Sequence, residues 1–139
     1  MGLFDKLIKT EHEWKNIAGE AFHYGDYEKA LCTLSKAIKI NSKRPDLFTS
    51  KGNTLKCLRR YSEALDAFGQ AIEIEPEYAL AWKGRGEVLS KMGRQSDATK
   101  SFYQAFKIDG PNAIFSADID PESYPSYAEA MEILKSEKR

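Results

Sequence analysis

A repeat period of 34 residues is the feature that most limits what this 139-residue chain can fold into. When the sequence is shifted by that length, six columns of residues keep their size and polarity. The columns are Trp14, Phe48 and Trp82; Ala18, Gly52 and Gly86; Ala30, Ala64 and Ala98; Leu34, Phe68 and Phe102; Ala37, Ala71 and Ala105; and Ile40, Ile74 and Ile108. Chains with such a period stack similar units, because one unit cannot bury its apolar face alone.

Each unit divides into two predicted helices, because its apolar residues follow helical spacing. The first helices are expected over residues 11–24, 45–58 and 79–92, and the second over residues 27–40, 61–74 and 95–108. Gly25-Asp26 and Gly93-Arg94 mark short turns, which make the paired helices antiparallel. Pro45 can open a helix, since its missing N–H would have no partner there. Small residues in the columns let helix backbones approach closely, while large ones fill the space beside them.

The units resemble tetratricopeptide repeats (TPRs), which share this length and this order of large, small and proline positions. Residues 45–78 match best, through Gly52, Tyr61, Ala64, Phe68, Ala71 and Pro76. Residues 11–44 depart at Ala21 and Ser42, and residues 79–112 have Gly110 where proline is usual. The resemblance implies an all-α, right-handed superhelical solenoid of three helix-turn-helix repeats that forms one domain over residues 1–139.

Both ends of such a stack need a cover. Residues 113–139 hold a linker and a helix at 125–138, whose apolar stripe is Tyr127, Ala130, Met131 and Leu134. This helix is predicted to be either a capping helix or the second half of a degenerate fourth repeat, with Ser126 and Glu129 in capping-box spacing. Residues 1–10 form an amphipathic segment through Leu3, Phe4, Leu7 and Ile8. That segment either covers the first repeat or docks on a membrane or a partner.

Composition excludes several classes of protein. Lys and Arg total 21 and so do Asp and Glu, and this zero net charge argues against a dedicated nucleic-acid or membrane binder. The first residues lack the apolar core of a signal peptide, and no apolar run is long enough to span a membrane. Cys32 and Cys57 are expected to be reduced. We therefore expect a cytoplasmic domain.

The sequence offers no constellation for catalysis, a metal or a cofactor. His12 and His23 are eleven residues apart on one predicted helix, too far to share a metal ion. Cys57 has no neighbouring histidine in sequence, and Gly84-Arg85-Gly86 lacks the third glycine of a dinucleotide loop. The acidic positions Asp118, Asp120, Glu122 and Glu129 resemble a calcium loop only loosely, because Ser123 replaces its central glycine. We therefore expect no enzyme activity and no cofactor.

The resemblance implies instead that the first helices line a concave groove that binds a peptide. Three rows of residues are predicted to line it: Lys15, Thr49 and Lys83; Gly19, Asn53 and Glu87; and Phe22, Lys56 and Ser90. The lysines favour a partner with acidic residues or a free C-terminal carboxylate, unless they are merely solvated.

Some TPR proteins use two lysines, two asparagines and an arginine to clamp the C-terminal carboxylate of heat-shock chaperones. Lys15 matches one of these places, but Gly19, Ser50, Leu80 and Gly84 occupy the others, which disfavours that function. The leading prediction is a protein-interaction adaptor or scaffold, active as a monomer or a weak homodimer. The alternative is a solenoid that self-associates through its end faces and has no separate ligand.

Overall fold

The computed structural model describes residues 9–110 and 124–139, and all regular structure in these two ranges is α-helical. The helices are α1 (Glu11–His23), α2 (Tyr27–Ile40), α3 (Pro45–Cys57), α4 (Tyr61–Ile74), α5 (Ala79–Lys91), α6 (Gln95–Asp109) and α7 (Pro125–Glu137). The predicted helical stretches are confirmed, and each of their ends agrees with the structure to within one residue.

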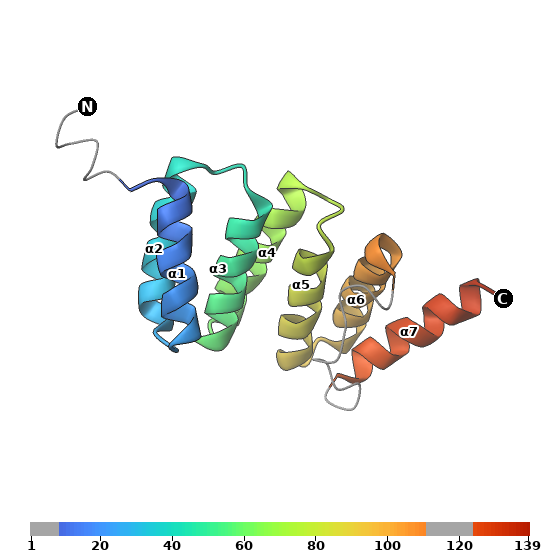
Figure 1. Ribbon diagram of the computed structural model, residues 1–139. Coiled ribbons are helices and arrows are strands. Elements are labelled where there is room, and N and C mark those ends of the chain that lie inside the picture. The colour runs from blue at the N-terminus through green and yellow to red at the C-terminus, as the bar shows by residue number, and fades with distance from the viewer. Residues whose placement is uncertain (1–8, 111–123) are drawn as a thin grey trace.

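The helices form three hairpins that stand side by side, so the chain runs from one end of an elongated molecule to the other (Figure 1). Helix α1 pairs with α2, α3 with α4, and α5 with α6. The second helix of each hairpin also packs against the first helix of the next hairpin, and α3 contacts α5 directly. The first helices therefore make one layer of the stack and the second helices make the other.

The three hairpins turn in the same way. The amide of Asp26 donates to the carbonyl of Ala21 over 2.8 Å, and Arg60 and Arg94 donate to the residues five positions before them in the same manner. Such a turn needs one residue with a left-handed backbone, which Gly25 (φ 78°) and Gly93 (φ 77°) provide. Arg59 takes this role in the middle hairpin at φ 58°, so glycine is not required at every turn.

The hairpins meet where a large side chain rests on glycine. Phe68 of α4 is fully buried, and a Cβ atom added to Gly52 of α3 would lie 2.7 Å from its ring. A Cβ atom added to Gly84 of α5 would lie 2.4 Å from the same ring, well inside contact distance. One aromatic ring thus packs against two helix backbones at once. Phe102 repeats half of the pattern against Gly86 at 2.9 Å.

The first unit keeps the same register with different volumes. The places of Phe68, Gly52 and Gly84 are held there by Leu34, Ala18 and Ser50. Leu34 and Ala18 are both buried and belong to the apolar core between α1, α2 and α3. Leu34 is smaller than Phe68, but Ala18 and Ser50 are larger than glycine, so the total volume changes little and the packing is preserved.

Helix α7 closes the far end of the stack. It packs along α6 and touches α5, and the ring of Tyr127 meets Phe106 and Phe102 edge-on at 5.1 and 5.7 Å. In the described chain no second helix pairs with α7, so of the two predicted alternatives its contacts fit a capping helix. It stands where the first helix of a following hairpin would stand.

The predicted capping box at Ser126 and Glu129 is wrong. Pro125 occupies the first helical position, so Ser126 lies inside the first turn and α7 has no side-chain cap. The Ser126 hydroxyl lies 2.6 Å from that of Ser90, and Glu129 accepts a hydrogen bond from Thr99. A capping box is present instead at the start of α1, between Thr10 and Glu13.

Two groups of sequence-based expectations lie outside the described residues. They are the apolar N-terminal face of Leu3, Phe4, Leu7 and Ile8, and the loosely calcium-like positions Asp118, Asp120 and Glu122. No helix in the two described ranges has both the length and the apolar character needed to cross a membrane.

The Phe68 contact predicts opposite effects for two glycine substitutions. Gly84→Ala should lower the free energy of unfolding by about 1–3 kcal/mol, because the new methyl group meets a ring that has no room to move. Gly69→Ala in α4 should raise it by about 0.5–1 kcal/mol, since its Cβ would meet nothing within 4 Å and alanine favours the helix. Urea unfolding followed by circular dichroism measures both values. A Gly84→Ala protein as stable as the wild type would contradict the packing described here.

Candidate functional site

Two adjoining hollows follow the layer of first helices. The first, with a volume of about 200 Å³, lies between α1 and α3, and the second, of about 300 Å³, lies between α3 and α5. Phe22 and Asn53 line both, so the hollows form one continuous surface, which we name the groove. The groove is open along its length and is walled by three helices.

Eight of the nine residues that the sequence predicted for the groove line one of these hollows. Lys15, Gly19, Phe22 and Asn53 line the first, and Thr49, Lys56, Lys83 and Glu87 line the second. Ser90 lines neither, because its hydroxyl lies against that of Ser126 on α7. The third predicted row is therefore occupied at its far end by the chain's own last helix.

Other lining residues were not predicted for the groove. Ala18, Leu34, Ser50 and Thr54 complete the first hollow, and Cys57, Leu80 and Gly84 complete the second. The three predicted rows did not include these residues, because each row takes a single position from each repeat. A hollow between helices is also lined by residues one helical turn away from those positions. Leu34 belongs to α2, the second helix of its hairpin, and lines the groove from behind the layer of first helices.

The groove has apolar side chains within a polar rim. Phe22 is 37% exposed and Leu80 is 47% exposed, both large for apolar residues. The floor of the first hollow is Ala18 and Leu34. This floor lies where, one repeat later, the larger Phe68 ring fills the space between α3 and α5. A smaller residue at the repeat position of Phe68 thus forms part of the wall of the first hollow.

The groove lysines are held by carboxylates of the following repeat. Lys56 Nζ lies 2.5 Å from Glu87 Oε2, and both side chains are largely covered. Lys15 Nζ lies 2.6 Å from Asp46 Oδ2. Each pair joins one first helix to the next, across 31 residues of sequence. Lys15 and Lys56 are thereby partly neutralised within the chain.

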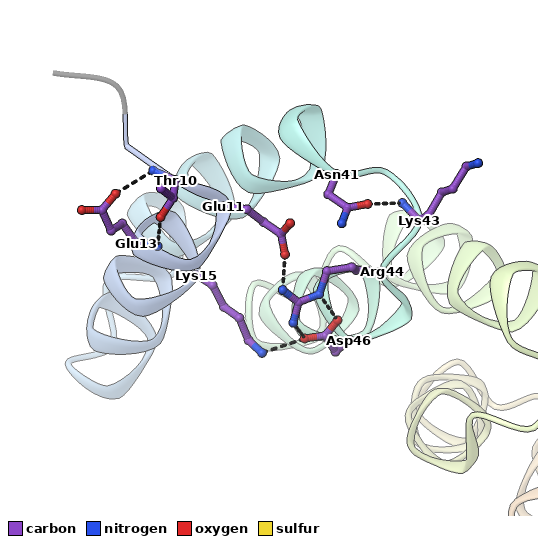
Figure 2. A network of polar contacts seen from close by, with 8 residues as sticks. All are labelled: Thr10, Glu11, Glu13, Lys15, Asn41, Lys43, Arg44 and Asp46. Carbon is purple, nitrogen blue, oxygen red and sulfur yellow. Dashed lines mark hydrogen bonds and ion pairs between the residues drawn. The ribbon is translucent and has the colours of Figure 1, made fainter. Parts of the chain in front are cut away.

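Asp46 is the centre of a polar network where the first hairpin meets the second (Figure 2). Arg44 donates to it through two nitrogens, at 3.1 and 2.7 Å, and also bonds Glu11 of α1. Burial alone would raise the pKa of Asp46, but hydrogen bonds from Lys15 and Arg44 outweigh it and hold that pKa below its ordinary value. The network thus keeps a carboxylate ionised where α1 meets α3.

Other candidates for chemistry do not come together. His12 and His23 are both exposed, and His23 stacks edge-on against Tyr24 at 5.4 Å. Cys32 and Cys57 are free and exposed, on α2 and α3. Within residues 9–110 and 124–139, no cluster of histidine, cysteine and acidic side chains is placed to hold a metal ion.

Comparisons with known proteins agree with this architecture. The family model of the tetratricopeptide repeat matches residues 45–78, which form the α3–α4 hairpin and the turn after it. A search of the curated proteins finds no match to the sequence. Solved structures of low sequence identity superpose over most of the chain.

Three of those structures illustrate the likeness. The first TPR of Spaghetti (RPAP3), bound to the HSP90 peptide SRMEEVD, has a TM-score of 0.75 and 17% identity, covering 91% of this chain and 94% of that one. The TPR2B domain of yeast Sti1 in complex with pHsp70 has a TM-score of 0.74 and 18% identity, covering 88% and 97%. The Sgt2 TPR domain of Aspergillus fumigatus has a TM-score of 0.74 and 15% identity, covering 93% and 82%.

These matches place the chain among the all-α repeat proteins with a solenoid fold. Residues 45–78 match the model of the tetratricopeptide repeat, and the described chain has the fold of solved TPR domains.

The Asp46 network predicts a pH-dependent contribution to stability. Asp46→Asn should lower the free energy of unfolding at pH 7 by about 1–2 kcal/mol, because Lys15 and Arg44 lose a charged acceptor. Since the folded pKa lies below the ordinary value of 3.8, this contribution is full above that value and is lost as the pH falls through the folded pKa. Urea titrations at pH 7, 5 and 3 should therefore show the gap between variant and wild type closing below about pH 4.

Asp97→Asn is the matched control, because the Asp97 carboxylate pairs with Arg94 on the exposed surface of one helix. It should change the free energy of unfolding by less than about 0.5 kcal/mol at any pH. A gap for Asp46→Asn that stays constant from pH 7 to pH 3 would show that the carboxylate is not held by the network.

Proposed function

We propose that this chain is a non-catalytic interaction module that binds an extended peptide segment of another protein in the groove. The observation that carries the proposal is the pair of adjoining hollows, walled by three helices and holding exposed Phe22 and Leu80 beside polar groups. Apolar side chains surrounded by polar donors and acceptors are the usual composition of a peptide-binding surface.

The solved TPR structures support the same use of the fold. The first TPR of Spaghetti is bound to the peptide SRMEEVD of HSP90, and the Sti1 domain is in complex with pHsp70. At 17–18% identity these likenesses concern the fold, and the partner of this chain is not thereby the same. The chaperone clamp stays disfavoured, because Gly19, Ser50, Leu80 and Gly84 offer no charged or amide side chain at its places.

The ligand we propose has two recognised parts. An apolar side chain enters the first hollow over Leu34, and the Asn53 amide, which lines both hollows, is available to a peptide backbone. An acidic residue or a C-terminal carboxylate of the ligand interacts with Lys15 and Lys83. Such a group must share Lys15 with Asp46, so the charge preference is weaker than three isolated lysines would give.

A self-associating solenoid is the alternative function. In that case two copies pair through the ends of the stack, and no separate ligand exists. Selection of a groove-binding peptide on the wild-type protein separates the two functions, because a solenoid without a separate ligand selects none.

Filling the first hollow should abolish peptide binding without disturbing the fold. A Cβ added to Gly19 meets no atom within 4 Å, so Gly19→Leu places its side chain in the open hollow. A peptide is first selected on the wild-type protein from a displayed library of random heptapeptides with free C-termini. Fluorescence polarisation should then show its affinity for Gly19→Leu reduced at least tenfold.

Gly69→Leu is the control for this substitution, because Gly69 also has open space but lies on α4, outside the groove residues. It should bind the selected peptide as the wild type does. Selection of the same peptides by the Gly19→Leu protein would remove the groove from consideration.

Charge reversal tests the acidic part of the ligand. The double variant Lys15→Glu/Lys83→Glu should weaken binding of the selected peptide at least tenfold if that peptide carries a carboxylate, since both donors then repel it. Lys100→Glu/Lys107→Glu on α6 changes the net charge equally and should have no effect. Equal affinity of all three proteins would leave the groove a binder of uncharged segments.

A further inference from the structure

The exposed sides of α2 and α4, with the turns that follow them, carry opposite charges at three matching positions of the repeat. On α2 and its following turn the exposed stripe is Lys29, Cys32, Lys36, Lys39 and Lys43; on α4 and its following turn it is Glu63, Asp66, Gln70, Glu73 and Glu77. We name these the α2 stripe and the α4 stripe. Every member of the second stripe follows its counterpart by 34 residues, and all ten residues are exposed. Within the helices, their spacing of three and four places the first four members of each set along one side.

Most of these charged side chains form no ion pair with another described residue. No ion pair of the described residues joins the two stripes. Lys36 lies 4.5 Å from the centre of the Trp14 ring, and Glu63 is bonded by Arg60. Lys39 of α2 and Lys43 after it, and Glu73 of α4 and Glu77 after it, lie in no ion pair of the described residues. The pattern stops there, because the equivalent α6 positions mix both signs as Asp97, Lys100, Gln104 and Lys107.

Two neighbouring stripes of opposite sign are complementary to themselves. A two-fold axis that runs parallel to the helices and midway between α2 and α4 places the α2 stripe of one copy against the α4 stripe of another. Residue n then faces residue n + 34 of the second copy, and the reverse contact follows from the symmetry. Lys39 meets Glu73 and Lys43 meets Glu77 in both halves of the interface.

Two apolar residues occupy the same place in this arrangement. Ile40 is 53% exposed and Ile74 is 36% exposed, each next to the last helical charge of its stripe. They too are 34 residues apart, so Ile40 of one copy faces Ile74 of the other. Their burial adds an apolar contact beside the ion pairs, which charge complementarity alone would lack.

We propose that this chain forms a symmetric homodimer through the α2 and α4 stripes. The occupant of this surface is a second copy of the same chain, because three places of the two stripes pair opposite charges: Lys29 with Glu63, Lys39 with Glu73, and Lys43 with Glu77. The groove is lined mainly by α1, α3 and α5, so the dimer leaves it open, and the inference does not depend on peptide binding. An interface of two helices per copy is small and largely ionic, so the dimer is weak and sensitive to salt.

Reversing the charges tests the pairing directly. Sedimentation velocity of the full chain from 10 µM to 1 mM should show a monomer–dimer equilibrium in 50 mM NaCl. The dimer dissociation constant should rise at least tenfold in 500 mM NaCl, because added salt shortens the Debye length, to about 3 Å at 1 M, and so screens the ion pairs. Lys39→Glu/Lys43→Glu and Glu73→Lys/Glu77→Lys should each raise the dissociation constant at least tenfold. In a homodimer of either double variant, side chains of the same charge would face each other across the interface.

Complementation separates this interface from any other. An equimolar mixture of the two double variants should form a heterodimer, and the fourfold variant that exchanges all four charges should dimerise as the wild type does. Lys100→Glu/Lys107→Glu on α6 is the matched control and should dimerise normally. A wild type that stays monomeric at 1 mM in 50 mM NaCl overturns the proposal, and so does a dimer that none of the reversals weakens, as end-to-end pairing predicts.

A disulfide trap reports the register. In a Cys57→Ser background, Asp66→Cys places a thiol opposite Cys32 of the second copy, and mild oxidation should give a covalent dimer on a non-reducing gel. Lys100→Cys, at the equivalent position of α6, should not do so. Equal crosslinking of both variants would show random collision rather than the proposed pairing.

Discussion

The ring of Phe68 rests on the backbones of α3 and α5 at once, and the spacing of the hairpins depends on that contact. A ring can take this place only because Gly52 and Gly84 have no side chains there. Because interiors are packed without spare volume, the ring fixes how closely the second hairpin approaches the third. The alignment of the first helices, and with it the wall of the groove, follows from this distance.

The same packing rule shapes the groove near its beginning. In the first unit Leu34 replaces the ring, and Ala18 and Ser50 replace the glycines, so a smaller side chain from α2 is offset by larger ones on α1 and α3. All three of these residues line the first hollow, so the exchange changes the surface of the groove. A difference in repeat sequence that looks like degeneracy thereby becomes a difference in surface shape.

The period and the turn residues predicted α1 to α6 to within one residue, because both are local or strictly periodic signals. The apolar stripe of Tyr127, Ala130, Met131 and Leu134 predicted α7 equally well. The placement of eight groove residues agrees with the same register, although their role remains a proposal. The pairing of Lys15 with Asp46 and of Lys56 with Glu87 could not be predicted, since it depends on side-chain reach between helices rather than on a repeat position. The capping box predicted at Ser126 was wrong because spacing alone indicated it. Pro125 already occupies the first helical position, so Ser126 lies inside the helix.

If the groove holds an extended segment, as proposed, helix α7 limits the length of that segment. Its Ser126 lies against Ser90 at the end of α5, so α7 closes the row formed by α1, α3 and α5 (Figure 1). Three helices about 8–10 Å apart span roughly 20 Å, which an extended chain crosses in about six residues at about 3.3 Å each. Since alternate side chains point away from the surface, about three would be read. So brief a signal can recur in many unrelated proteins, and selectivity among them would have to come from local abundance or from engaging two copies of the signal at once.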